Sequence, residues 1–230
     1  MCTHSYVTTV DTLHRITAYL TELLWPPRCA ACGRGTQPAC SGCLASLAPA
    51  RSHRPSRYAY IDRLMSATSL TPVVESFVYA LKYHGVHALA LPLADRLCDL
   101  LCLRRETSAV FGPNPLIIPV PLHESRLRER GFNQADLLAQ RIASTTAMIL
   151  NTTSLTRIRP THQQAKTSNR AERRDNMKGA FAVCDASAVL DRDIVLVDDI
   201  CTTGATLEDC ARALKEAGAR TVSALVLAHG

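Results

Sequence analysis

The sequence predicts an α/β protein in which a parallel sheet is flanked by helices. Three short apolar segments, residues 116–120, 189–197 and 221–228, have the length and composition of buried strands. Segments with helical spacing of apolar residues, such as 135–147 and 207–217, lie between them. Strands that alternate with helices are typical of βαβ units, whose strands run parallel. Because ligands of such sheets bind at the carboxyl ends of the strands, a site is expected there.

Length, charge and hydropathy limit the kinds of protein that this sequence can encode. The 230 residues suffice for one sizeable domain and an accessory module. The net charge of +6 permits anionic partners such as phosphates or nucleic acid without requiring them. We expect no transmembrane segment, since no apolar run is long enough, and no secretory signal, since residues 1–12 are polar. The expected location is the cytoplasm, where disulfides are rare.

Two closely spaced cysteine pairs follow an amphipathic helical pattern at residues 10–24. They are Cys29-x₂-Cys32 and Cys40-x₂-Cys43. Each pair can hold a metal ion from a tight turn, and four thiolates form a closed tetrahedral Zn²⁺ site. Such a site is structural, because no coordination position stays open for chemistry. Iron–sulfur ligation is the alternative, whereas disulfides do not suit the expected compartment.

A basic linker separates the cysteines from the rest of the chain. Residues 49–57 contain three arginines and two prolines. With Tyr58 and Tyr60 as stacking groups, this region suits single-stranded nucleic acid, although a solvated linker has the same composition. Two helical patterns follow, at 71–82 and 88–104. The expected organisation is an N-terminal helical segment at 1–28, a zinc module at 29–48, a basic linker at 49–66 and the α/β domain at 67–230.

Three arginines follow the first predicted strand. Arg126, Arg128 and Arg130 stand between the strand at 116–120 and the helix at 135–147. Arginine is permanently charged and binds phosphate oxygens in a bidentate manner. Their place at the carboxyl end of a strand favours an anion site, although a solvated, ion-paired helix start is the alternative.

Residues 157–181 form a long polar segment that includes Arg173. Loops of this length in compact domains are usually functional or disordered. A basic lid that closes over an anionic ligand would exclude water and stabilise charge on a leaving group. A surface loop without such a role is the alternative.

The most informative segment is residues 194–206. Its apolar start ends in Asp198 and Asp199, and a hydroxyl-rich turn and a helix follow. A helix N-terminus suits a phosphate, and adjacent carboxylates suit a sugar diol or Mg²⁺. An ordinary buried strand would not gain from two such carboxylates. The order therefore predicts a ligand with a diol at one end and a phosphate at the other. A P-loop nucleotide hydrolase is excluded, because the sequence lacks G-x-x-x-x-G-K-[ST].

This segment resembles the phosphoribosyl-pyrophosphate (PRPP) signature of type I phosphoribosyltransferases. The signature has four apolar residues, two acids, two variable residues and Thr-Thr-Gly-x-Thr, and Cys201 in a variable position is the unusual residue here. The resemblance implies that Asp198 and Asp199 bind the ribose hydroxyls of PRPP, which carries Mg²⁺. It also implies that the turn wraps the 5′-phosphate through Thr202, Thr203, Gly204, Ala205 and Thr206.

Together these features resemble the ComF/GntX family, which joins a four-cysteine zinc module to a type I phosphoribosyltransferase-like domain. The motifs that carry the likeness run from about residue 24 to the end of the chain. They are the cysteines, Val120-Pro121-Leu122-His123 with Arg126, Arg130-Gly131-Phe132-Asn133-Gln134, Gln164 to Glu172-Arg173 and Asn176, Gly179-Ala180-Phe181, and the PRPP signature.

The resemblance implies a role in DNA uptake during natural transformation, with PRPP, single-stranded DNA and the uptake machinery as partners. The alternative is a transferase of nucleotide salvage that moves ribose-5-phosphate to a nitrogen acceptor. In that chemistry Asp198, Asp199 and Arg173 are the catalytic candidates, and Arg126 and Arg130 would stabilise pyrophosphate with Arg173. We expect PRPP binding more firmly than transfer, because no segment after the last predicted strand forms a hood for an acceptor base.

Overall fold

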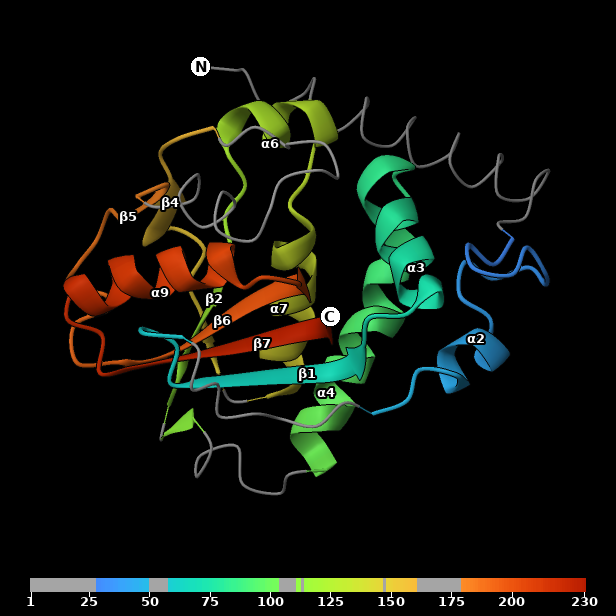
Figure 1. Cartoon of the computed structure of the whole chain (residues 1–230), viewed down its shortest axis with the longest axis horizontal. Coiled ribbons are helices and arrows are strands. Elements are labelled where there is room, and N and C mark those ends of the chain that lie inside the picture. Colours follow the sequence, from blue (N-terminus) through green and yellow to red (C-terminus); the bar gives the residue numbers. More distant parts are fainter. Residues whose placement is uncertain (1–27, 50–57, 104–110, 113, 147, 161–178) are drawn as a thin grey trace, which may run out of the picture.

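The computed structural model describes residues 28–49, 58–103, 111–112, 114–146, 148–160 and 179–230 (Figure 1). Three expectations lie outside the described residues: the helix at 10–24, residues 50–57 of the basic linker, and the central part of the polar segment with Arg173.

A five-stranded parallel sheet forms the centre of the molecule, in the order β1-β7-β6-β2-β3. This confirms the predicted fold class. The long strands β6 and β7 lie in the middle, and the chain ends beside β7 (Figure 1). The strands are β1 (Arg63–Ser69), β2 (Leu116–Pro119), β3 (Ile149–Leu150), β6 (Asp193–Cys201) and β7 (Thr221–His229).

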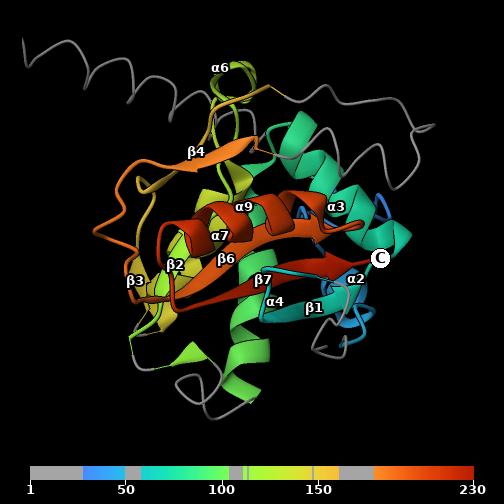
Figure 2. The ribbon, with the colours of Figure 1, turned by 60° about the vertical axis from the view of Figure 1, so that its left-hand side comes forward.

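Helices cover both faces of the sheet. Alternate residues of β6 point to opposite faces, as the pleat of a strand requires. Val195 and Val197 pack in a core with α3, α4 and α7, whereas Ile194 and Leu196 pack in a second core with α9. Figure 2 shows α9 on one side of the sheet and α4 and α7 on the other. The helices are α2 (Ser41–Ala45), α3 (Pro72–Tyr83), η1 (His87–Leu89), α4 (Ala90–Leu103), α6 (Glu124–Arg130), α7 (Gln134–Thr145) and α9 (Ala205–Glu216).

The strand β1 differs from the sequence-based expectation. The sequence predicts that residues 63–66 belong to the linker. In the structure they are the first residues of β1, so the α/β unit begins at Arg63. The segment mixes apolar Leu64 and Met65 with polar Ser66 and Thr68, yet all four side chains are buried. The Ser66 hydroxyl donates to the Thr68 carbonyl at 2.6 Å. Because a buried hydroxyl can bond to the backbone, serine and threonine occupy core positions here. The sequence therefore lacks the polar and apolar alternation that would have indicated a strand.

Two short strands lie at the two ends of the polar segment 157–181, for which the sequence indicated a loop. β4 (Leu155–Arg157) and β5 (Phe181–Val183) pair antiparallel and pack beside α9. Strands of three residues are too short to show a periodic pattern. Similarly, β6 was expected to end before the two acids but continues through them to Cys201, because β7 pairs with it as far as His229.

Candidate functional site

The two acids of the PRPP-like segment lie near the carboxyl end of β6. Asp199 N–H donates to Asp198 Oδ1 at 2.9 Å, and Ile200 N–H donates to Asp199 Oδ1 at 2.6 Å. The strand still pairs with β7 at this level, where Asp198 lies opposite Val226. The acids are therefore held on a rigid strand at the edge of the sheet where ligands of parallel sheets bind.

The turn after β6 leads directly into α9. Gly204 is the N-cap of the helix and has a left-handed backbone, with φ of +77°. The Thr203 hydroxyl accepts a hydrogen bond from Ala205 N–H at 3.3 Å, and Gly204 C=O accepts one from Glu208 N–H at 2.8 Å. Thr202 is exposed, and Thr203 and Thr206 are half-buried. This arrangement presents hydroxyls and the N–H groups of a helix N-terminus, which together can bind a phosphate.

Tyr58 packs against this turn, a contact that the sequence did not reveal. A Cβ at position 204 would lie 2.4 Å from atoms of the Tyr58 ring, and the Tyr58 hydroxyl is 3.7 Å from Cys201 Sγ. The N–H groups of Ala59 and Tyr60 both donate to Glu208 Oε1 of α9. Tyr58 is only 8% exposed. The expectation that Tyr58 stacks on nucleobases is therefore wrong, since its ring is part of the second core.

Gly204→Ala should lower the free energy of unfolding by more than the backbone cost alone. A side chain with left-handed φ costs about 1–2 kcal/mol, and the added Cβ would also clash with Tyr58. Gly131→Ala is the matched control, because Gly131 has φ of +80° and an open Cβ position. Urea unfolding of both variants measures the difference. Equal losses for the two variants would contradict the contact with Tyr58.

A half-buried lysine lies against the acid pair. Lys82 Nζ, from the last turn of α3, is 2.8 Å from both Asp199 Oδ1 and Asp199 Oδ2. Burial alone would lower the pKa of Lys82, but the charges of Asp199 and Asp198 raise it overall. The lysine is therefore a permanent cation in the site. The local sequence around Lys82 does not indicate this contact, because 117 residues separate the lysine from Asp199.

Arginines of α6 and β4 lie near the acid pair and its lysine. Arg157 of β4 is partly buried, which lowers its pKa, and it lies close enough to Asp198 and Arg126 for their charges to act on it. Its guanidinium also lies over the Phe181 ring, at 5.4 Å. Arg130 lies over the Tyr83 ring, at 5.6 Å. The structure thus places the predicted Arg126 and Arg130 on α6 and adds Arg157, which sequence reasoning treated as loop.

Asp198 has an unusual protonation equilibrium. Burial and the neighbouring charge of Asp199 raise its pKa to about 7, although Lys82 and Arg157 oppose the shift. A carboxyl with this pKa exchanges its proton near neutral pH. Perturbed groups of this kind cluster at functional sites.

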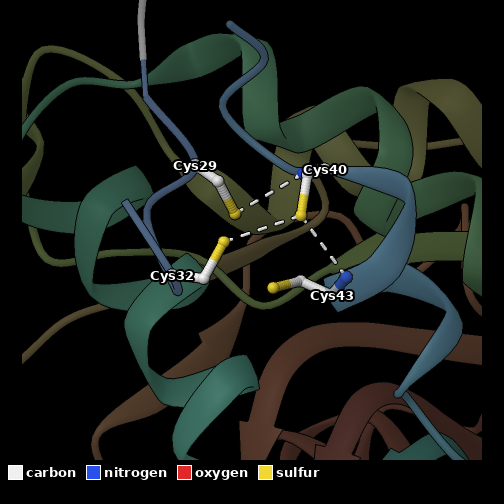
Figure 3. Close-up of side chains that lie close together, drawn as sticks. All are labelled: Cys29, Cys32, Cys40 and Cys43. Atoms are coloured by element: carbon white, nitrogen blue, oxygen red, sulfur yellow. Dashed lines mark hydrogen bonds between the residues drawn. The ribbon is translucent and has the colours of Figure 1, made fainter. Parts of the chain in front are cut away.

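The four cysteines predicted to bind metal lie together beside α2 (Figure 3). Their sulfur atoms are all within 4.8 Å of one another. Cys40 N–H donates to Cys29 Sγ at 3.5 Å, and Cys43 N–H donates to Cys40 Sγ at 3.4 Å. Four converging sulfur atoms supported by backbone N–H groups fit the donor set of a structural metal site.

The cysteine module is docked on the α/β unit. Leu47 is buried in the core of α3 and α4, and its carbonyl accepts a hydrogen bond from Arg96 of α4 at 2.7 Å. Pro49 forms an antiparallel bridge with Thr68 of β1. The module and the sheet therefore share one hydrophobic core.

The chain is similar to known proteins of one group. The family model for the phosphoribosyl transferase domain matches residues 127–230. DNA utilization protein YhgH of Salmonella typhimurium is 35% identical over 161 residues, which is 70% of this chain and 69% of that protein. Competence protein F of Haemophilus influenzae is 35% identical over 114 residues, 49% of each chain. Competence protein ComFC of Bacillus subtilis is 33% identical over 119 residues, 49% of this chain and 43% of that protein.

Within the part of the chain that the structure describes, no helix is long and apolar enough to span a membrane.

Proposed function

Because this chain belongs to the ComF family, whose members carry a phosphoribosyltransferase-like domain, we propose that it binds Mg·PRPP at the carboxyl edge of its sheet. The observation that carries the proposal is the continuous path from the two acids of β6 to the helix N-terminus of α9. Asp198 and Asp199 would accept the ribose hydroxyls, and residues 202–206 would hold the 5′-phosphate. Arg126 and Arg130, with Arg173 of the polar segment, would neutralise the pyrophosphate.

The Asp198→Asn, Asp199→Asn double variant should lose binding of Mg·PRPP in titration calorimetry. Each replaced carboxylate removes a charge-assisted hydrogen bond, which contributes about 1.5–3 kcal/mol. Asp99→Asn is the matched control, since its side chain on α4 is 63% exposed and far in sequence from the site. Zinc content and circular dichroism should match wild type in both proteins. Unchanged affinity in the double variant would refute the ribose assignment.

Mg²⁺ would be bound by the ligand and not by a protein cage. The ion prefers phosphate and carboxylate oxygens and retains several waters. When bound, it would neutralise charge on the pyrophosphate. The task of the chain's own residues is then to hold the ribose, the 5′-phosphate and the pyrophosphate in one orientation.

We also propose that the protein handles single-stranded DNA during uptake, as the names of its relatives suggest. The net charge of +6 supports this, and so does an exposed aromatic cluster near the acid pair. Tyr79 and Tyr83 of α3 are 57% and 46% exposed, with ring centroids 4.8 Å apart. The Tyr79 ring also lies 5.3 Å from that of His84, and Arg130 lies over Tyr83. Exposed rings beside a cation are the stacking platform that unpaired bases use.

Tyr79→Ala with Tyr83→Ala should weaken binding of a fluorescent oligonucleotide in an anisotropy titration. Each stacked base contributes about 1–3 kcal/mol, so the loss should be roughly tenfold or more. Leu190→Ala serves as the control, because Leu190 is 63% exposed and follows β5. If the tyrosine variant binds as tightly as wild type while a cysteine variant does not, the zinc module and linker are the binding surface instead.

Transfer of the ribose-5-phosphate to a nitrogen acceptor remains the alternative use of the site. Incubation with PRPP and a panel of bases distinguishes the two roles. Release of pyrophosphate with any base would establish transfer, and binding without release would favour the role in DNA handling.

A further inference from the structure

The proposed PRPP site and the aromatic cluster meet at the last turn of α3. Lys82 lies on the side of the acid pair, with its ammonium 2.8 Å from Asp199. Tyr83, the next residue, is 46% exposed, and its ring centroid lies 4.8 Å from that of Tyr79. Successive residues of a helix point to different sides. One turn of α3 therefore contributes to both binding surfaces.

Arg130 lies beside both surfaces. Its guanidinium carbon is 5.6 Å from the centroid of the Tyr83 ring. Burial and the charge of Arg130 both act to lower the pKa of Lys82, although the carboxylates of the acid pair raise it overall. The same cation thus lies over an exposed ring and within electrostatic range of the lysine that contacts Asp199.

Packing holds the end of α6 in this place. Arg130 is the last residue of α6, and its guanidinium donates to the side chain of Gln134, which is 4% exposed. The Phe132 ring, two residues later in the chain, lies 4.1 Å from the ring of His87 in η1. Phe132 also packs against the core that α3 and α4 share. These contacts keep Arg130 next to the end of α3.

Arg130 also differs in its partners from the other arginines of α6. Arg126 pairs with Glu129 at 2.8 Å. Arg128 pairs with Glu124 at 3.2 Å. Among the described residues, no carboxylate forms an ion pair with Arg130, which donates to a neutral amide. Its charge is therefore available to an anion, and a guanidinium suits a phosphate.

We propose that Mg·PRPP and single-stranded DNA bind antagonistically, because the pyrophosphate and the DNA backbone compete for Arg130. The inference rests on the two proposed binding functions and adds the coupling between them. One guanidinium binds one phosphate in the bidentate geometry. Mg·PRPP also keeps a net negative charge, which repels nearby DNA phosphates. By linkage, each ligand lowers the affinity for the other by the same factor, so Mg·PRPP promotes the release of bound DNA.

Anisotropy of a fluorescent oligonucleotide measures this coupling at constant ionic strength, since DNA binding depends on salt. Saturating Mg·PRPP should weaken oligonucleotide binding by roughly tenfold, the effect of losing one charge-assisted contact. Titration calorimetry of Mg·PRPP with and without saturating oligonucleotide should give the same factor. Saturating ribose-5-phosphate lacks the pyrophosphate and should change oligonucleotide affinity by less than about twofold.

Two arginine variants test whether Arg130 carries the coupling. Arg130→Gln should weaken both ligands and bring the coupling factor close to one, because neither ligand then gains from this charge. Arg128→Gln is the matched control on the same helix, since the Arg128 side chain is 73% exposed and already paired with Glu124. It should keep the coupling factor of wild type.

Three results would overturn the inference. Oligonucleotide affinity that Mg·PRPP leaves unchanged or raises in wild type would exclude antagonism, even though both proposed binding functions hold. Equal coupling factors in the two arginine variants would exclude Arg130 as the shared group, and so would a ribose-5-phosphate effect as large as that of Mg·PRPP. If wild type fails to bind one of the ligands, that proposed function fails, and the inference fails with it.

Discussion

Cys32→Ser should abolish the zinc content of the purified protein and unfold the cysteine module. Binding of structural zinc contributes about 10–16 kcal/mol in zinc-finger peptides at neutral pH. The module has little secondary structure of its own, because its one helix, α2, has five residues and none of them is buried. Metal analysis should find a single zinc ion per wild-type chain and none in the variant. The expected unfolding should also expose the core contact made by Leu47.

Cys184→Ser provides the control for this substitution. Cys184 is also exposed but lies far from the sulfur cluster in sequence, so the variant should keep its zinc. Because the module shares a core with α3 and α4, loss of zinc should lower the melting temperature of the whole protein. Retention of a full equivalent of zinc by Cys32→Ser would rule out the four-cysteine site.

The parts of the fold that sequence predicted are those that local patterns encode. The inner strands are continuous apolar runs, since helices cover both faces, and residues 194–197 are fully buried in β6. The cysteine spacing is equally local, and the structure brings all four sulfur atoms together as predicted. The N-cap of α7 is also local: Asn133 is a residue type preferred at that position, and its side chain accepts from Ala135 N–H.

The parts that sequence did not predict depend on contacts between distant residues. Lys82 ends an amphipathic helical pattern, and such a position suggests an exposed side chain. Its ammonium instead donates to Asp199, 117 residues later in the chain. Tyr58 looked like an exposed ring beside a basic linker, but Gly204 leaves the space that its ring fills. In both cases the local sequence pattern fits either a buried or an exposed side chain. The packing of the strands and helices against one another determines where the side chain lies.

Asp209→Ala should destabilise the protein by about 3–5 kcal/mol, the usual cost of breaking a buried ionic network by removing one member. Asp209 of α9 is 5% exposed. Its carboxylate accepts from the N–H groups of Gly179, Ala180 and Phe181, at 2.8, 2.7 and 3.1 Å. It also pairs with Arg212 at 2.9 Å. Alanine would leave three backbone donors without their acceptor, which costs more than the bonds themselves contribute, and would leave Arg212 with Glu216 as its remaining ion-pair partner among the described residues.

Glu216→Ala isolates the contribution of the arginine pair. Glu216 also pairs with Arg212, but its side chain is 59% exposed, so its removal should cost less than about 1 kcal/mol. Guanidinium unfolding compares the two variants, and a loss below that of Glu216→Ala would show that Asp209 does not hold β5. Hydrogen exchange gives the local result: the amides of residues 179–181 should lose protection in Asp209→Ala alone.

The position of the hydrogen bonds around Asp209 has a consequence for ligand binding. Asp209 fixes the point at which the chain returns from the polar segment that contains Arg173, and it does so from the helix whose N-terminus forms the phosphate-binding turn. If that segment closes over pyrophosphate, Asp209→Ala should weaken Mg·PRPP even under conditions where the variant is fully folded. Ribose-5-phosphate lacks the pyrophosphate, so its affinity should change little. An equal loss for both ligands would place the effect in the turn at Gly204 and not in the lid.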